Sequence, residues 1–395
     1  MNKLSVYDAP VEGKKVLLRC DFNVPYDENG EISDTRRIDE SLETIKFLIN
    51  KNAKVIICSH FRRPHGVFDK SMSLKKAVDY LKLKLKNINI KFASDVVGES
   101  AKFLVSSLKE GEICVLENLR FEIGEEENSE EFAKKLASLA DIYVNDGFGV
   151  CHREHASLVG VPKFLPSYCG FLIQKEVRTI SSIINNPKRP LVSILGGAKV
   201  SDKIGVIENL VDKVDAFIIG GGMTYTFMNA LGYSIGDSIC EKSKLNLAKD
   251  ILAMTKEKNV KLLLPIDCKL GKEYKSDTET MIVDSDKIPN GWQGLDIGPK
   301  SIELFSNELK NAGSVIWNGP LGVSEWSSFA TGTFSIARLL ANLDAQTVIG
   351  GGDVAAAVNK AGVANKMYHI STGGGSSLMF LEGKELPAIA ALPDK

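Results

Sequence analysis

The sequence predicts an α/β protein made of two doubly wound, parallel-sheet (Rossmann-like) domains joined by a connecting helix and hinge. Short apolar runs alternate with segments whose apolar residues recur at helical spacing, which is typical of βαβ units and therefore of a parallel sheet. This alternation stops in the proline- and glycine-containing stretch 162–190 and resumes after it. The length of 395 residues also suits two domains better than one.

The first half of the chain contains the first set of expected strands and helices. Buried strands of a parallel sheet are short and apolar, whereas the helices that cover the sheet show one apolar face. We expect strands at Lys15–Arg19, Lys54–Cys58, Ile113–Leu116 and Ile142–Val144, a helix carrying Ile38, Leu42, Ile45 and Leu48, and another carrying Phe132, Leu136 and Leu139.

The second half repeats this organisation after a connecting helix at Phe171–Ile184. Prolines bracket that helix on both sides, so hinges are expected at its ends. We therefore place domain boundaries at 1–169, 170–186 and 187–377. Strands are expected at Leu191–Leu195, Ala216–Ile219, Leu262–Leu264, Val315–Trp317, Thr347–Ile349 and Met367–Ile370.

Composition excludes several classes of function. The net charge is −1, so no overall field attracts the protein to nucleic acid or to an anionic membrane. The seven cysteines show neither CxxC nor zinc-type spacing, which favours free thiols in a reducing compartment. The N-terminal residues lack an apolar signal core, and no run is long enough to span a membrane, so a cytoplasmic location is expected.

The stretch Leu191–Ile204 has the pattern of a phosphate-binding turn: an apolar strand, two glycines, and then a helix expected to begin near Ala198. Glycines let the backbone approach an anion, and the N–H groups at a helix start attract negative charge. In such a helix Lys199 and Lys203 would share one face. An ordinary strand-to-helix turn followed by two solvated lysines remains the alternative.

Cationic residues follow the expected strands of the first half, where ligands of open parallel sheets bind. Guanidinium groups converging on one sheet edge would clamp phosphate or carboxylate oxygens, whereas a single arginine is usually a surface ion-pair partner. His60 and His152 are either donors to the same anion or ordinary polar loop residues. The residues concerned are Asp21 and Asn23, Arg36 and Arg37, His60 to Arg63, Arg120, and His152 and Arg153.

Glycine triplets take the corresponding positions in the second half: Gly220–Gly222, Gly350–Gly352 and Gly373–Gly375. Such turns either bring backbone amides onto a polyphosphate or simply allow tight packing. Asp353, after the second triplet, is a helix cap or a magnesium ligand. Neither GxxxxGK[ST] nor GxGxxG occurs, which argues against a P-loop enzyme and against a nicotinamide-dependent dehydrogenase.

Taken together, these motifs resemble those of the phosphoglycerate kinase family along essentially the whole chain. The resemblance implies a monomeric, cytosolic, hinge-bending glycolytic enzyme that transfers a phosphoryl group between 1,3-bisphosphoglycerate and MgADP, giving 3-phosphoglycerate and MgATP. It also implies that the C-terminal segment 378–395 packs back on the first domain. The motifs are RCDFNVP, SHFRRP, LENLRF, DGFGVCHR, GFLIQKE, LGGAKVSDKI, IIGGGM, LDIGP, WNGPLGV, GGGD and STGGGSS.

The resemblance also assigns roles to individual residues. For catalysis it implies Arg37, Lys199, Gly373, Gly374 and Gly375, and for magnesium it implies Asp353. The implied substrate site contains Asp21, Asn23, Arg37, His60, Phe61, Arg62, Arg63, Arg120 and Arg153. The implied nucleotide site contains Gly197, Lys199, Lys203, Gly220, Gly221, Gly294, Asn318, Pro320, Glu325, Gly351, Gly352, Asp353 and Val354.

Three positions depart from the family pattern. Arg62 stands where glycine is usual, which affects the shape of the loop or adds a charge near the substrate. Val354 replaces a threonine or serine, so we expect weaker nucleotide binding, and Gly147 replaces an alanine with little effect. A catalytically impaired nucleotide-binding homologue is therefore the alternative to an active kinase.

Overall fold

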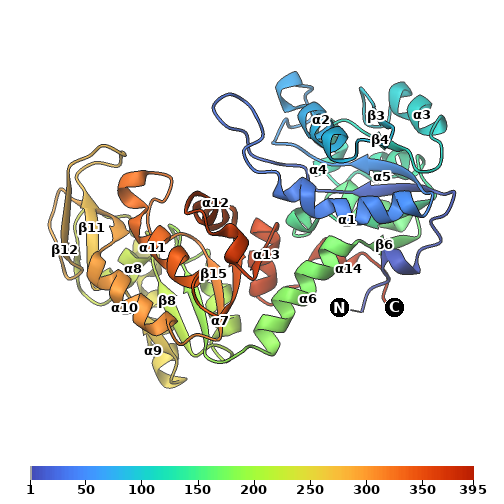
Figure 1. Cartoon of the computed structure of the whole chain (residues 1–395). Helices are drawn as coiled ribbons and strands as arrows, with labels where there is room; N and C mark the ends of the chain where they lie inside the picture. Colours follow the sequence, from blue (N-terminus) through green and yellow to red (C-terminus); the bar gives the residue numbers. More distant parts are fainter. Residues whose placement is uncertain (1) are drawn as a thin grey trace. The chain divides into compact units, whose positions relative to one another are not determined.

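The computed structural model describes residues 2–395, which form two compact units (Figure 1). Unit 1 contains the chain up to Arg178 together with Glu385–Lys395, and unit 2 is Thr179–Lys384. The division falls within helix α6, Phe171–Asn185. The C-terminal return to unit 1 starts at Glu385, later than the expected residue 378, because 378–384 pack within unit 2.

Unit 1 is built on a six-stranded sheet with the order β3-β4-β2-β1-β5-β6. The pairs of neighbouring strands are all parallel, as predicted, with Val16 of β1 in register with Val55 of β2 and Ile142 of β5. The carboxyl ends of its strands therefore meet at one edge. The strands are β1 Lys15–Arg19, β2 Lys54–Cys58, β3 Ile90–Phe92, β4 Ile113–Val115, β5 Ile142–Asn145 and β6 Ser167–Cys169.

Helices α1 and α2 pack on one face of this sheet and bury the apolar stripe that the sequence indicated. Ile38, Ile45 and Leu48 of α1 are fully buried against the strands. Burial of such side chains is the main stabilising contribution to a core of this kind. The helices of unit 1 are α1 Arg36–Asn50, α2 Lys75–Lys84, α3 Glu99–Ser106, α4 Ile123–Glu126, α5 Glu130–Ala137 and α14 Pro387–Ala390.

Unit 2 has its own six-stranded parallel sheet, in the order β10-β8-β7-β15-β16-β17. A three-stranded antiparallel sheet, β12-β11-β14, and a short pair, β13-β9, were not predicted. The strands are β7 Leu191–Leu195, β8 Ala216–Ile219, β9 Ser234–Ile235, β10 Lys261–Leu263, β11 Asp267–Gly271, β12 Thr280–Asp284, β13 Lys287–Ile288, β14 Gln293–Ile297, β15 Ser314–Asn318, β16 Gln346–Gly350 and β17 His369–Ile370.

Helices α10, α11 and α12 cover one face of the large sheet of unit 2. Trp317 of β15 is fully buried there with Phe305 of α10 and Ile336 of α11. The helices of unit 2 are α7 Ile204–Leu210, α8 Thr224–Ala230, α9 Leu245–Glu257, α10 Pro299–Leu309, α11 Thr331–Leu340, α12 Gly352–Lys360 and α13 Gly374–Leu381.

The prediction that a helix begins near Ala198 is wrong, because α7 begins at Ile204. Gly197 has φ +109°, and its N–H donates to Pro320 O while its carbonyl accepts from Met223 N. These bonds tie the backbone after β7 to neighbouring loops instead of to a helical turn. Lys199 therefore lies in the turn, and Lys203 stands at the cap position that precedes α7.

The two ends of the chain lie side by side in unit 1 (Figure 1). Lys3 and Asp394 form an antiparallel bridge, and Leu4 N donates to Pro393 O over 3.1 Å. The seven cysteines are free thiols, of which only Cys240 is partly exposed. Within residues 2–395 no helix combines the length and the apolar character that crossing a membrane would require.

Candidate active site

The cationic residues predicted in the first half gather at the carboxyl edge of the unit 1 sheet. Asp21 follows β1, His60 follows β2, and Arg120 lies in the short helix η3, Leu119–Phe121, after β4. Arg37 is the second residue of α1, and Arg153 lies in the loop after β5. The gathering follows from the parallel topology, which brings these strand ends together.

Arg37 and Asn23 form the best-defined contacts of this group. Arg37 Nη1 lies 3.0 Å from Asp21 Oδ2 and also donates to Asn23 O over 3.0 Å. Asn23 Oδ1 accepts from Arg62 N over 2.9 Å, and Arg62 O accepts from Arg120 Nη1 over 2.6 Å. The loops after β1, β2 and β4 are thus joined by hydrogen bonds, which fixes their polar groups relative to one another.

The pKa values of His60 and Arg120 reflect burial first and then the charges of neighbouring residues. The pKa of His60 is held well below its usual value by burial first and then by Arg19, Arg120, Arg37 and Arg153. Burial, opposed in part by Glu126, lowers the pKa of Arg120 to about 10, and Arg153 contributes to the same shift. His60 is therefore neutral at pH 7, and the arginines carry the positive charge that would attract an anion.

Arg62 has the backbone conformation that glycine adopts readily. Its φ is +53°, in the left-handed region, which is strained for a side chain of this size. Its guanidinium lies 5.3 Å from the centroid of the Tyr26 ring and 5.2 Å from that of Phe61. Arg62 therefore preserves the loop shape that a glycine would give, and aromatic contacts hold its added charge in place.

Arg63 stands apart from the other predicted cationic residues. The side chain of Arg63 is exposed, and no hydrogen bond or ion pair within residues 2–395 joins it to the other arginines. Burial and then Arg153 lower the pKa of His152 to about 4, so this histidine is also neutral at pH 7. Of the predicted cationic groups, the structure therefore brings together Arg37, Arg120 and Arg153.

Three residues that organise this region were not given roles from the sequence. Asn118 accepts from Phe61 N and Arg120 N at Oδ1 and donates to Phe61 O, so it fixes two loops at once. Arg19 is fully buried, and its Nη2 lies 3.4 Å from His60 Nδ1. Asp146 Oδ1 accepts from Leu172 N over 2.8 Å at the start of α6. The sequence does contain features that could have indicated these three residues. Arg19 is an arginine at the end of an apolar strand, Asn118 is a polar residue of the LENLRF motif, and Asp146 is a polar residue of the DGFG motif.

The glycine turns of unit 2 pack backbone against backbone. A Cβ on Gly221 would lie 2.7 Å from both N and O of Gly197, and one on Gly220 would lie 2.4 Å from Leu321 Cδ2. Gly221 N donates to Leu321 O over 3.0 Å. The loops after β7, β8 and β15 therefore form one close-packed group, which includes Pro320.

Lys203 is the buried cation of this group. Its ammonium donates to Asn318 Oδ1, and burial lowers the pKa of Lys203 although Asp202, Glu382 and Asp353 act in the opposite direction. Lys199, by contrast, has an exposed side chain. One of the two predicted lysines is thus fixed by the fold, and the other projects from the turn.

Two helices begin beside one another at the carboxyl ends of β16 and β17. Gly351, with φ +94°, precedes α12, and a Cβ on Gly374 at the start of α13 would lie 4.0 Å from Gly352 N. Unpaired N–H groups at helix starts favour anions. Asp353 lies in the first turn of α12 with an exposed carboxylate, whereas the side chain of Val354 is fully buried in the core.

Gly294 and Glu325 occupy different surroundings. Gly294 lies in β14, where a Cβ would come within 1.8 Å of the Tyr225 hydroxyl, and its N–H donates to Ser238 Oγ over 2.9 Å. Packing against Tyr225 is therefore a sufficient reason for glycine at this position. Glu325 is exposed in the loop after β15.

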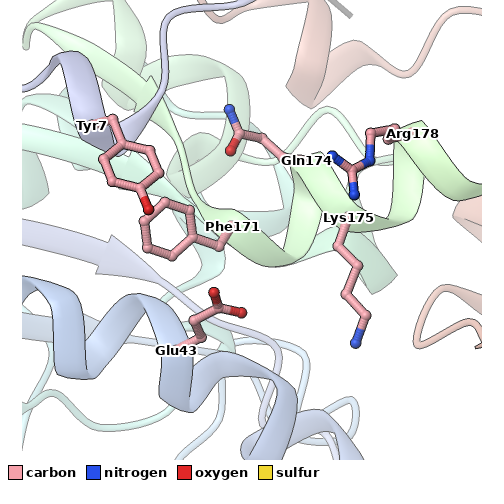
Figure 2. A pocket seen from close by; sticks show the side chains of 6 residues that line it. All are labelled: Tyr7, Glu43, Phe171, Gln174, Lys175 and Arg178. Carbon is pink, nitrogen blue, oxygen red and sulfur yellow. The ribbon is translucent and has the colours of Figure 1, made fainter.

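A separate hollow of about 560 Å³ in unit 1 contains none of the predicted residues (Figure 2). The rings of Tyr7 and Phe171 pack at 4.8 Å on one side, and Glu43 lies across from them. Lys175 and Arg178 project from α6. The charges around this hollow are of both signs, which distinguishes it from the arginine-rich sheet edge.

The fold and these two groups of loops define a class: a two-unit α/β protein with an arginine-rich sheet edge in one unit and two adjacent helix starts after glycine turns in the other. The phosphoglycerate kinase family model matches residues 6–384. The chain belongs to the phosphoglycerate kinase family, and it is accordingly an enzyme of the kinase class.

Relatives and solved structures agree with this assignment. The chain is 51% identical over 397 residues to a phosphoglycerate kinase of Clostridium tetani, covering 100% of this chain and 98% of the relative. It is 52% identical over 397 residues to one of Clostridium botulinum, with 100% and 99% covered. The structure of phosphoglycerate kinase from Coxiella burnetii aligns with a TM-score of 0.84 at 38% identity, and that from Pyrococcus horikoshii with 0.82 at 30%, each covering 98% of both chains.

Proposed function

We propose that this protein catalyses the reversible transfer of the acyl phosphate of 1,3-bisphosphoglycerate to MgADP, giving 3-phosphoglycerate and MgATP. The observation that carries the proposal is the convergence of Arg37, Arg120 and Arg153 around the neutral His60 at one sheet edge. Guanidinium groups match carboxylate and phosphate oxygens bidentately, and 3-phosphoglycerate carries both kinds of group.

Unit 1 would bind the phosphoglycerate. Asp21 and Asn23 O already hold Arg37, so its guanidinium is oriented before a ligand arrives. The hydrogen bonds from Arg62 N to Asn23 Oδ1 and from Arg120 Nη1 to Arg62 O likewise hold the neighbouring loops in place before a ligand arrives. Such preorganisation reduces the entropy lost when the ligand binds. The proposed binding residues are Asp21, Asn23, Arg37, His60, Phe61, Arg62, Arg63, Arg120 and Arg153.

Unit 2 would bind the nucleotide at its glycine turns and at the starts of α12 and α13. A nucleotide-bound Mg²⁺ is usually held by phosphates and only one or two carboxylates, and the exposed carboxylate of Asp353 fits that mode. Magnesium would neutralise phosphate charge there. The proposed residues are Gly197, Lys199, Lys203, Gly220, Gly221, Gly294, Asn318, Pro320, Glu325, Gly351, Gly352, Asp353 and Val354.

The chemistry needs alignment and charge stabilisation. The nucleophile is a phosphate oxygen in one direction and a carboxylate in the other, and both are ionised at pH 7, so no general base is required. Arg37, Lys199 and the amides of Gly373–Gly375 would stabilise charge on the transferring group. Hinge closure that brings both substrates together would also keep water from the acyl phosphate. We further propose a cytoplasmic monomer.

A coupled assay tests the proposal. Purified protein with ATP, magnesium and 3-phosphoglycerate should consume ATP only when all three are present. Lys199→Ala should lower kcat by at least about 100-fold, because its exposed ammonium is assigned to the transferring group. Lys256→Ala, which removes another exposed lysine of unit 2 at the end of α9, should change kcat less than twofold. Failure to consume ATP, or equal effects of the two variants, would contradict the assignment.

A further inference from the structure

A second hollow in unit 1, of about 600 Å³, lies at the carboxyl ends of β3 and β4. Phe92 is the last residue of β3, Ser94 follows it, and Glu117 follows β4. This is the edge at which open parallel sheets bind ligands, and the volume is in the usual range for small-molecule sites. The lining residues are Tyr26, Phe68, Lys70, Ser71, Ser73, Lys75, Lys76, Phe92, Ser94 and Glu117.

Three aromatic side chains give the hollow an apolar character. Phe68 is 64% exposed although it is large and apolar, and it is fixed against Phe121 with ring centroids 4.9 Å apart. Tyr26, another lining residue, is fixed against Phe61 with ring centroids 4.9 Å apart. An exposed ring that is held in place presents a surface to a ligand without an entropy cost for ordering it.

The one carboxylate in the lining is already saturated. Glu117 is 4% exposed; its Oε1 accepts from Ser73 Oγ, and its Oε2 accepts from Leu74 N over 3.3 Å and from Asn118 N over 2.7 Å. The Glu117 carboxylate is therefore held by local hydrogen bonds from Ser73, Leu74 and Asn118.

Lysines supply the charge at the rim. Lys75 pairs with Asp79, and Lys76 pairs with Glu31 over 2.9 Å while its ammonium lies 5.4 Å from the Tyr26 ring centroid. Lys70 is exposed, and among residues 2–395 no carboxylate lies within ion-pair distance of it. The rim therefore has an excess of positive charge at Lys70, next to the aromatic wall formed by Phe68.

We propose that this hollow is a binding site for a small aromatic anion, with the ring against the aromatic side chains of the lining and the acidic group at Lys70. The chemistry differs from that of the arginine cluster, which we assign to phosphoglycerate. None of the residues assigned to either substrate lines the hollow, and Phe61 and Arg62 only contact its residue Tyr26, so the proposal does not depend on the proposed reaction.

The test uses 8-anilinonaphthalene-1-sulfonate, an aromatic sulfonate whose fluorescence rises when it binds. Titration of the full-length protein should give one saturable component per chain, and saturating 3-phosphoglycerate with MgATP should leave it in place. Phe68→Ala should weaken this component about tenfold and Lys70→Glu about threefold or more.

Matched controls isolate the site. Phe103→Ala removes another exposed phenylalanine, 71% accessible on α3, and Lys82→Glu makes the same charge change on α2; neither residue lines the hollow. Both should change the dissociation constant less than twofold. Circular dichroism should show all four variants folded, as expected for exposed positions.

Several outcomes would overturn the proposal. These are the absence of a saturable component at millimolar dye, its displacement by 3-phosphoglycerate or MgATP, and equal weakening by the control variants. Binding of the uncharged analogue N-phenyl-1-naphthylamine with the same affinity would show that Lys70 does not select an anion.

Discussion

Arg37 and Arg36 are neighbours in sequence that the structure gives different partners. Arg37 contacts Asp21 and Asn23 O, whereas Arg36 Nη2 pairs with Asp34 over 2.6 Å. Only the first of these partnerships lies in the arginine cluster. The pair therefore provides an internal comparison between a site arginine and a structural one.

We expect Arg37→Ala to lower kcat by at least about 100-fold, since it removes a preorganised positive charge from the reacting region. Arg36→Ala should lower kcat less than threefold and reduce stability by about 1 kcal/mol or less. Steady-state kinetics and urea unfolding of both variants give the comparison. Near-normal turnover of Arg37→Ala would remove the main assumption of the mechanism.

Arg62 combines a strained backbone conformation with a positive charge beside the proposed phosphoglycerate site. Arg62→Gly keeps the left-handed φ of +53° and removes only the guanidinium over Tyr26 and Phe61. We expect KM for 3-phosphoglycerate to rise about two- to fivefold with kcat unchanged, and the salt dependence of KM to become weaker. Kinetics at low and high potassium chloride measure both. An unchanged KM would mean that the charge does not reach the substrate.

At the level of elements, the turns of unit 2 depend on glycine for two separable reasons. Gly221 has φ +67° and has no space for a Cβ, which would lie 2.7 Å from Gly197 N. Gly232 has φ +87°, but nothing lies within 4 Å of where its Cβ would be. Replacing Gly232 by alanine therefore measures the energetic cost of the left-handed conformation alone. Replacing Gly221 measures that cost together with the cost of crowding by the added Cβ.

We expect Gly232→Ala to reduce the free energy of unfolding by about 1 kcal/mol. Gly221→Ala should reduce it by at least about 2 kcal/mol more, because three backbone atoms would have to move. It should also raise KM for ATP, since the crowded turn belongs to the proposed nucleotide site. Urea unfolding measures the two stability losses, and steady-state kinetics measures KM. Equal losses of stability in the two variants would show that the loops around Gly221 can move apart to admit a Cβ without an energetic cost.

The sequence was sufficient for the elements whose pattern is local. β1, β2, β7 and β8 have the predicted bounds because a continuous apolar run flanked by polar residues specifies a buried parallel strand. The antiparallel strands β11, β12 and β14 were missed because their alternation is weak, as in Asp267–Gly271, and because β14 pairs with β11 across the intervening strands β12 and β13.

For the candidate site, position after a strand indicated Arg120 and Arg153, and position at the start of the first helix indicated Arg37. Position alone could not give the role of Asn118, whose amide joins loops 57 residues apart in the chain. Nor could it place the start of α7, because the hydrogen bonds from Gly197 N to Pro320 O and from Met223 N to Gly197 O override the local helical signal. The features that could not be predicted from the sequence are those that depend on hydrogen bonds between residues distant in the chain.

At the scale of the whole molecule, buried histidines make stability depend on pH. Burial and then Arg120 lower the pKa of His155 to about 3, although Glu125 Oε1 lies 3.8 Å from its Nδ1. The unfolded chain, with a pKa near 6.5, therefore takes up this proton first as the pH falls. The contribution of His155 is fully present above pH 6.5 and is lost as the pH falls toward 3.

We expect the wild type to lose up to about 1.4 kcal/mol more per pH unit below pH 6.5 than His155→Gln does. Urea unfolding of both proteins at pH 7 and pH 5 measures the difference. Phe103→Ala, at an exposed position of the same unit, should follow the wild type. Parallel pH profiles of wild type and His155→Gln would show that His155 does not titrate as the structure indicates.

The buried cysteines can be used to detect local unfolding, because a buried thiol becomes reactive only when the structure around it opens. Burial raises the pKa of Cys58 to about 12 and that of Cys268 to about 11, so neither reacts readily with a maleimide in the native state. Five of the buried thiols belong to unit 1, and Cys268 is the buried one of unit 2. With Cys240 blocked in advance, the order in which the remaining cysteines acquire label during gentle heating would reveal which half of the enzyme loosens first.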